Sequence, residues 1–146
     1  MKKNCDYFGE VFRIVKSKLD KVILGVPGLV GLKYAFLFTK YSKEILVANK
    51  ESLVCGALVL LKQAKNNNCK ITSIDSEHFS IYQIIKNKNL NNIDSVFLTA
   101  SGGPFLNKKV KSYSKANIKE VTNHPRWKMG NKISVDSATM CNKIFE

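Results

Sequence analysis

The chain has 146 residues, of which 45% are hydrophobic, and its formal net charge is +13. A chain of this length suits about one folded domain, and its apolar share excludes a generally disordered protein. Nearly all of the positive charge is lysine, with Arg13 and Arg126 as the two arginines, so a nucleic-acid partner recognised through arginine side chains is not expected.

The predicted elements alternate between helices and strands. Apolar residues recur at helical spacing over about residues 6–20, which predicts an amphipathic helix. Short apolar runs bounded by polar or glycine residues predict strands at 22–24, 45–48, 71–74, 96–99 and 133–135. Helices are predicted between the first four strands, at 29–41, 51–65 and 80–86. This alternation is typical of parallel βαβ units, so the predicted fold class is α/β.

Two other segments bear on the class of protein. Residues 107–119 are rich in lysine, serine and asparagine, which predicts an exposed connection that leads into a short helix. Residues 22–38 are the longest apolar stretch, but a lysine, a proline and glycines interrupt it, and a bilayer span needs about 20 apolar residues. The first residues do not resemble a secretory signal. We therefore expect a cytoplasmic protein without a membrane partner.

Polar residues follow four of the predicted strands. They are Asn49-Lys50-Glu51-Ser52, Asp75-Ser76-Glu77-His78, Ser101-Gly102-Gly103-Pro104, and Asp136-Ser137, with Asn142, Lys143 and Glu146 on a following helix. In doubly wound α/β proteins, ligands bind beyond the carboxyl ends of the strands. We therefore expect these four groups to face one crevice.

The acidic residues allow two interpretations each. Asp75 and Glu77 are two apart in a segment predicted to be extended, so their carboxylates can share one hard cation. Alternatively, Asp75 or Ser76 caps the next helix. Glu146 is four residues after Asn142 and shares a helix surface with Lys143, which favours either a joint binding surface or a surface ion pair.

The remaining candidates are also open to a structural interpretation. Ser101 and the two glycines after it offer a hydroxyl and unhindered amides that suit a phosphate, although short glycine turns are common. His124 is either catalytic or a structural hydrogen-bonding residue. Trp127 either packs or covers a ligand. Lys50 either pairs with a phosphate or caps the sheet edge.

Five motifs occur in a fixed order between Val22 and Glu146. They are ANKES at 48–52, DSEH at 75–78, TASGGPF at 99–105, HPRWKMG at 124–130 and KISVDSATMCNKIFE at 132–146. Together they resemble the 1-deoxy-D-xylulose 5-phosphate reductoisomerase family. The resemblance implies isomerisation of this phosphosugar and its reduction by NADPH to 2-C-methyl-D-erythritol 4-phosphate in non-mevalonate isoprenoid synthesis.

The resemblance also implies roles for individual residues. Asp75, Glu77 and Glu146 match the ligands of a divalent cation, Mn²⁺, Mg²⁺ or Co²⁺, which polarises the substrate carbonyl. Lys50, Glu77 and His124 match catalytic positions. The substrate contacts implied are Lys50, Ser76, Glu77, Ser101, His124, Ser137, Asn142, Lys143 and Glu146. Asn49, Glu51 and Gly130 match NADPH contacts, and Trp127 matches an aromatic residue of a lid.

The resemblance implies the middle of a longer enzyme. The chain lacks the family's glycine-rich turn for the cofactor pyrophosphate, and Ile144 replaces a glycine of the last motif. Residues 1–74 are expected to be the remainder of a Rossmann-like NADPH-binding domain, and 75–146 the start of an α+β catalytic domain. The family forms homodimers. The missing turn motivates a second hypothesis, a non-catalytic module that binds phosphate or cations, and charge alone motivates a third, a nucleic-acid-binding domain.

Overall fold

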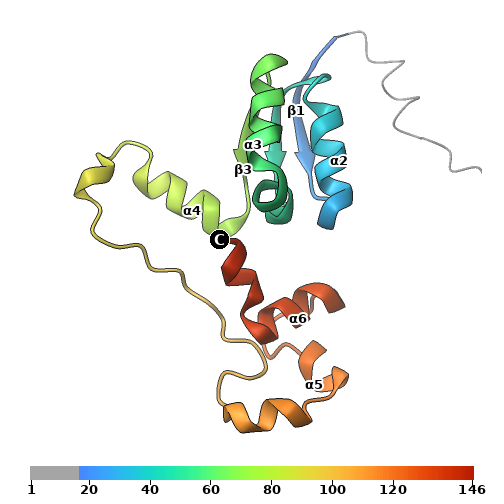
Figure 1. The fold of residues 1–146 in the computed structure, drawn as a ribbon, viewed down its shortest axis with the longest axis vertical. Helices are drawn as coiled ribbons and strands as arrows, with labels where there is room; N and C mark the ends of the chain where they lie inside the picture. Colours follow the sequence, from blue (N-terminus) through green and yellow to red (C-terminus); the bar gives the residue numbers. More distant parts are fainter. Residues whose placement is uncertain (1–16) are drawn as a thin grey trace, which may run out of the picture. The chain divides into compact units, whose positions relative to one another are not determined.

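The computed structural model describes residues 17–146, which form two compact units divided between Gln83 and Ile84. The first unit contains a parallel sheet of strands β1 (Leu19–Leu24), β2 (Ser42–Val47) and β3 (Lys70–Ser73), in the order β1-β2-β3 (Figure 1). In the register, Ile45 of β2 lies beside Val22 of β1 and Ile71 of β3. This sheet confirms the predicted α/β class.

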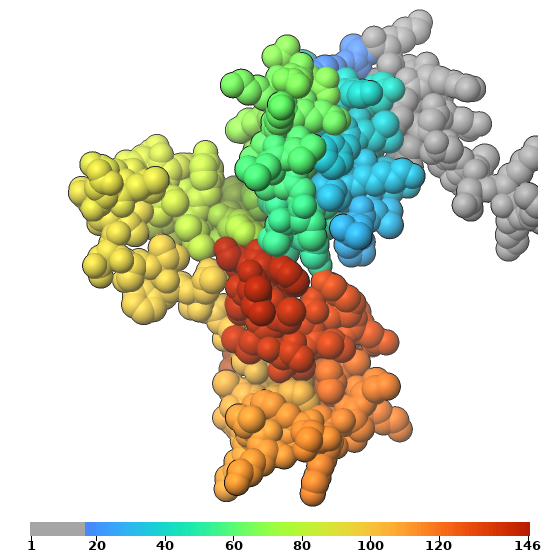
Figure 2. Space-filling model, viewed as in Figure 1, coloured from blue at the N-terminus to red at the C-terminus, as the bar shows by residue number. Residues whose placement is uncertain are grey.

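Two helices connect the strands and pack against each other. Helix α2 (Gly28–Phe38) joins β1 to β2, and α3 (Lys50–Asn66) joins β2 to β3. Their contact with the sheet buries a core of Leu24, Ala35, Phe38, Ile45, Val47, Leu60, Ala64 and Cys69. Apolar side chains also lie on the outer surface of α3, shown in green in Figure 2, where Val54, Leu58 and Leu61 are at least 49% exposed.

Glu44 on the central strand β2 contacts side chains of both neighbouring strands. Glu44 accepts a hydrogen bond from Thr72 Oγ1 at 2.7 Å and lies 3.3 Å from the ammonium of Lys70 and 3.4 Å from that of Lys21. The Thr72 hydrogen bond, with the two lysines, lowers the pKa of Glu44 below its ordinary value of 4.5, although partial burial opposes this. The ionised form of Glu44 therefore stabilises the folded sheet.

The lowered pKa of Glu44 predicts an acid-dependent stability. Its contribution is fully present above pH 4.5, the ordinary value, and is lost as pH falls through the lower pKa of the folded state. We expect Glu44→Gln to reduce the free energy of unfolding near neutral pH, with a difference from the wild type that shrinks on acidification. Urea unfolding across this range measures it, and a difference that is constant with pH contradicts the assignment.

The second unit consists of short helices joined by extended chain. Helix α4 (Ser76–Ile85) leads into it from the first unit, followed by a 3₁₀ turn η1 (Leu90–Asn92) and an extended segment. The 3₁₀ helix η2 (Val110–Lys115) and α5 (Ile118–Thr122) form the exposed connection and short helix predicted at 107–119. The last elements are α6 (Asn131–Thr139) and the 3₁₀ helix η3 (Cys141–Phe145), which pack together.

Three predicted elements were wrong in type or extent. The predicted helix at 6–20 lies outside the described residues up to residue 16, and its last part is wrong because Leu19 begins β1 and pairs with Ser42. Residues 96–99 are extended but pair with no strand in the described chain, so they form no ladder. Residues 133–135 lie in α6, because the small buried residues Ser134, Ser137 and Ala138 recur at helical spacing.

The segment after β3 also differs from the prediction. Residues 75–77 were expected to be extended, but α4 begins at Ser76 and the carbonyl of Asp75 accepts the first helical hydrogen bond from Phe79 N at 2.9 Å. The helix predicted to carry Asn142, Lys143 and Glu146 is a 3₁₀ helix that ends at Phe145, so Glu146 is its C-cap. Met140 has φ of 59° and ends α6, so Asn142 and Lys143 lie on η3. The other predicted strands and helices are confirmed with boundaries shifted by up to four residues.

Candidate metal-binding and anion-binding residues

The carboxyl edge of the sheet brings Lys50 and Asp75 together in the first unit. Lys50 begins α3 just after β2, and Asp75 follows β3, so the two neighbouring parallel strands end beside each other. The Lys50 ammonium lies 3.3 Å from Asp75 Oδ2, and the side chains are 17% and 9% exposed. Of the four groups expected to follow strands and face one crevice, these two follow neighbouring strands and lie together. The other two do not follow strands, because residues 96–99 pair with no strand of the described chain and 133–135 lie in α6.

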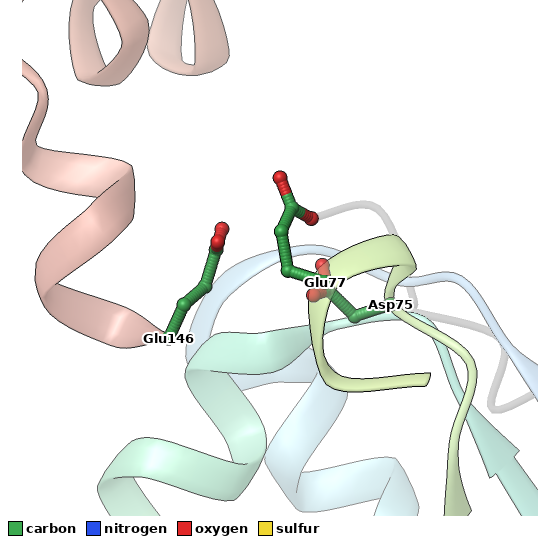
Figure 3. Close-up of side chains that lie close together, drawn as sticks. All are labelled: Asp75, Glu77 and Glu146. Carbon is green, nitrogen blue, oxygen red and sulfur yellow. The ribbon is translucent and has the colours of Figure 1, made fainter. Parts of the chain in front are cut away.

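The other Asp75 oxygen contacts His78 on the first turns of α4. His78 Nδ1 lies 3.0 Å from Asp75 Oδ1, a contact between residues three apart. Nearby, the Ser76 hydroxyl donates to Glu77 Oε2 at 2.5 Å. Figure 3 draws Asp75 and Glu77 on the turn that opens α4, and Glu146 at the end of the second unit. Asp75 thus directly precedes α4, and its side chain pairs with Lys50 and contacts His78.

Asn49 holds the frame around this edge. It is 4% exposed, its Oδ1 accepts from Ser52 N at 3.1 Å, and its Nδ2 donates to the carbonyls of Val26 at 2.5 Å and Gly28 at 2.9 Å. One side chain thus caps α3 and fixes the loop that leads from β1 to α2. A Cβ at Gly31 would overlap the Asn49 amide, so this tie also requires glycine in α2.

The donor chemistry of this edge suits a hard divalent cation. Asp75 and Glu77 contribute carboxylate oxygens, the ligands that Mg²⁺ and Mn²⁺ prefer. The Asp75 side chain is 9% exposed and is held between the Lys50 ammonium and the His78 ring, as ligating carboxylates are commonly held by outer partners. The residues present therefore fit a metal ion. The contacts with Lys50 and His78 hold the Asp75 carboxylate in a fixed orientation.

His124 forms the centre of a hydrogen-bond network in the second unit. It is 8% exposed, and its Nδ1 accepts from the backbone N–H groups of Arg126 at 3.2 Å and Trp127 at 3.0 Å. In the neutral ring the proton is therefore on Nε2, which donates to Ser101 Oγ at 3.0 Å. Because Ser101 Oγ accepts this bond, its own hydroxyl proton is available for a ligand oxygen.

A cavity of about 520 Å³ lies beside Ser101 in the same unit. Its walls include Lys108, Glu120 and Arg126. The negative charge of Glu120 is balanced there by the Lys108 ammonium, which lies 3.0 Å away. The hydrogen bond from Lys108, with that from the backbone N–H of Asn117, lowers the pKa of the Glu120 carboxyl below 4.5. The cavity therefore has a net cationic lining that suits an anionic ligand.

Gly103 brings the Ser101 loop against α6. Its φ is +59°, and a Cβ there would lie 2.7 Å from the carbonyl oxygen of Ser137. Only glycine permits this close approach of two backbones. The Ser101 loop, which is predicted to bind a phosphate, therefore lies beside Ser137, another predicted site residue, within one unit.

We expect Gly103→Ala to destabilise the second unit by about 2 kcal/mol, because alanine is strained at positive φ and would overlap the α6 backbone. The matched control is Gly130→Ala, since a Cβ at Gly130 meets no atom within 4 Å. Thermal unfolding followed by circular dichroism measures both. Equal melting temperatures for the two variants contradict the close approach.

Glu51 lies in the first turn of α3 in the first unit, and the remaining predicted site residues lie on the second unit. Lys143 pairs with Glu146 at 3.0 Å as the ion-pair interpretation expects, but the pair is not at the surface, since the two side chains are 15% and 0% exposed. Asn142 Oδ1 is buried and has no hydrogen-bond partner among the described residues. Gly130 precedes α6 as its N-cap. Trp127 is 61% exposed and not packed, so the covering role remains a prediction. Sequence reasoning missed the pairing of His78 with Asp75, although the spacing of three residues was visible.

Comparisons with known proteins agree over nearly the whole chain. The model of the 1-deoxy-D-xylulose 5-phosphate reductoisomerase C-terminal domain matches residues 71–146, and the 1-deoxy-D-xylulose 5-phosphate reductoisomerase model matches residues 9–57. A reductoisomerase of this name from Pelagibacter ubique (strain HTCC1062) is 40% identical over 143 residues, which are 98% of this chain and 37% of that protein. One from Clostridium botulinum (strain Alaska E43 / Type E3) is 42% identical over 130 residues, or 89% and 34%.

Solved structures give the same result. A DOX-P reductoisomerase in complex with NADPH, fosmidomycin and magnesium is 39% identical, with a TM-score of 0.78 over 95% of this chain and 36% of that one. The Zymomonas mobilis 1-deoxy-D-xylulose 5-phosphate reductoisomerase in complex with NADPH is 28% identical, with a TM-score of 0.75 over 94% and 35%. The chain spans about a third of the length of the relatives that it matches. Among the described helices, none is long and apolar enough to cross a membrane.

Proposed function

Because the chain belongs to the 1-deoxy-D-xylulose 5-phosphate reductoisomerase family, we propose that its protein converts 1-deoxy-D-xylulose 5-phosphate to 2-C-methyl-D-erythritol 4-phosphate in isoprenoid synthesis. The reaction is an isomerisation followed by reduction with NADPH. The observation that supports it best is the paired Lys50 and Asp75 at the carboxyl edge of the sheet. This is where an α/β protein binds its ligand.

The proposed metal ligands are Asp75, Glu77 and Glu146. Bound Mg²⁺ or Mn²⁺ would polarise the substrate carbonyl and stabilise the negative charge that develops on the substrate oxygens. Among the described residues, Asp75 is held by His78 and Lys50, which fixes the direction of its carboxylate. The proposal for Glu146 rests on its place in the last motif, four residues after Asn142.

The proposed substrate contacts of the second unit are hydrogen donors. Ser101 has a hydroxyl proton to give, since its oxygen accepts from His124 Nε2. Ser137, Asn142 and Lys143 supply further donors for the phosphate and hydroxyl groups of the phosphosugar. In this proposal His124 positions Ser101, because its Nδ1 accepts from two backbone N–H groups while its Nε2 donates to Ser101 Oγ. Its own contact with the substrate is proposed from its place in the HPRWKMG motif. Ser76 completes the set of polar groups around the substrate.

The cofactor contacts of the proposal are Asn49, Glu51 and Gly130, with Trp127 on a lid. Asn49 has its amide committed to the fold, so its part is to hold the cofactor-facing backbone in place. The exposed Trp127 indole suits a group that closes over a ligand and excludes water. We further propose a cytoplasmic homodimer that acts on a small phosphosugar.

The test is NADPH consumption by the purified gene product that contains this chain, with 1-deoxy-D-xylulose 5-phosphate and Mn²⁺. We expect the absorbance of NADPH to fall, and a chelator to stop the reaction. NADPH consumption that continues in excess chelator contradicts the metal requirement. Mn²⁺ and phosphosugar binding without turnover contradicts the enzyme and favours a non-catalytic binding module.

A further inference from the structure

The environment of Asp75 leaves no carboxylate oxygen without a partner. Oδ1 contacts His78 Nδ1 at 3.0 Å, and Oδ2 lies 3.3 Å from the Lys50 ammonium. The Asp75 side chain is 9% exposed, so water does little to balance its charge. Within the described residues, the fold therefore supplies Asp75 with a positive charge from the neighbouring helix.

The two partners differ in how readily they move away. His78 is three residues after Asp75 on the helix that begins there, and its ring contact resembles the outer hydrogen bond that orients a metal-ligating carboxylate. Lys50 approaches from a different element, α3, on a flexible four-carbon side chain. A divalent ion on Asp75 Oδ2 would be repelled by an ammonium on the same oxygen. Lys50 is thus the partner that a metal ion would displace.

We propose that Lys50 is a displaceable counter-ion that holds Asp75 until a divalent cation binds and is then released toward an anionic oxygen of the substrate. This inference rests on the proposed metal site. It predicts a binding order, because the ammonium becomes available to the phosphosugar only after the metal has replaced it. Lys50 is then a positioning residue that couples metal binding to substrate binding.

The first test compares Mn²⁺ affinities by isothermal titration calorimetry of the 146-residue chain without substrate. Lys50→Met removes the competing cation, so we expect Mn²⁺ to bind about tenfold tighter than to the wild type, a usual size for coupled sites. The control is Lys43→Met, which removes an equal charge from the same unit but from the exposed pair with Asp20 at 2.7 Å. Its Mn²⁺ affinity should match the wild type.

Unchanged or weaker Mn²⁺ binding by Lys50→Met overturns the inference, because Lys50 would then only orient Asp75. If the wild type binds no Mn²⁺, the proposed metal site fails and the inference falls with it, so the two failures are distinguishable. A second readout needs no variant. Mn²⁺ should raise the rate at which an acylating reagent modifies Lys50 of the wild type, measured by peptide mass spectrometry, with Lys43 unchanged. Equal Lys50 labelling with and without Mn²⁺ overturns the displacement.

Discussion

Asp75→Asn is expected to weaken Mn²⁺ binding by about 100-fold while the fold is kept. Loss of an outer hydrogen-bond partner alone commonly costs 10-fold to 100-fold in metal affinity, and this change removes the charged ligand itself. Asparagine has nearly the same shape and can still accept a hydrogen bond from Lys50 or His78. Calorimetric titration with Mn²⁺ measures the effect, and circular dichroism tests the fold.

The matched control for Asp75→Asn is Asp20→Asn. Asp20 is a carboxylate of the same unit, paired with Lys43, and its side chain is 85% exposed. We expect it to leave Mn²⁺ affinity unchanged. If both variants bind Mn²⁺ as the wild type does, the metal is held elsewhere and Asp75 serves only to pair with Lys50.

Asn49→Ala is expected to destabilise the first unit by about 3 kcal/mol. It removes a helix cap worth about 1 kcal/mol and two hydrogen bonds to the carbonyls of Val26 and Gly28, each worth about 1 kcal/mol. Asn49 is itself 4% exposed, so its amide lies largely away from water. Urea unfolding monitored by circular dichroism gives the change in the free energy of unfolding.

Asn117→Ala provides the comparison, since Asn117 is also an asparagine N-cap but forms an exposed capping box with Glu120 on the short helix α5. We expect a cost below about 1 kcal/mol. Comparable losses for the two variants contradict the view that Asn49 joins two loops in addition to capping α3.

The first unit was predictable because its sequence signals and its packing agree. The run at 45–48 lies within or beside the central strand β2, and the runs on either side pair with it in parallel. The second unit was less predictable. Residues 133–135 are β-branched or polar and favour a strand locally, but the buried small face of α6 overrides that preference. Residues 96–99 have strand composition, yet a strand needs a partner that periodicity cannot supply.

The candidate site was predicted in its residues but not in its contacts. The rule that ligands bind beyond strand ends selected Lys50 and Asp75, and they are paired. It did not indicate that the Asn49 side chain forms its hydrogen bonds within the fold. Its two bonds to backbone carbonyls depend on where the distant loop between β1 and α2 lies. Nor did it give the tautomer of His124, which the backbone at Arg126 and Trp127 fixes.

Calorimetric titration of the 146-residue chain with fosmidomycin, with and without Mg²⁺, tests the central claim most directly, since a similar structure holds this compound together with magnesium. The proposed metal-dependent substrate site predicts heat of binding with Mg²⁺ present and its loss on adding a chelator or on Asp75→Asn. Binding of equal strength with and without Mg²⁺, or in the Asp75→Asn variant, contradicts the account.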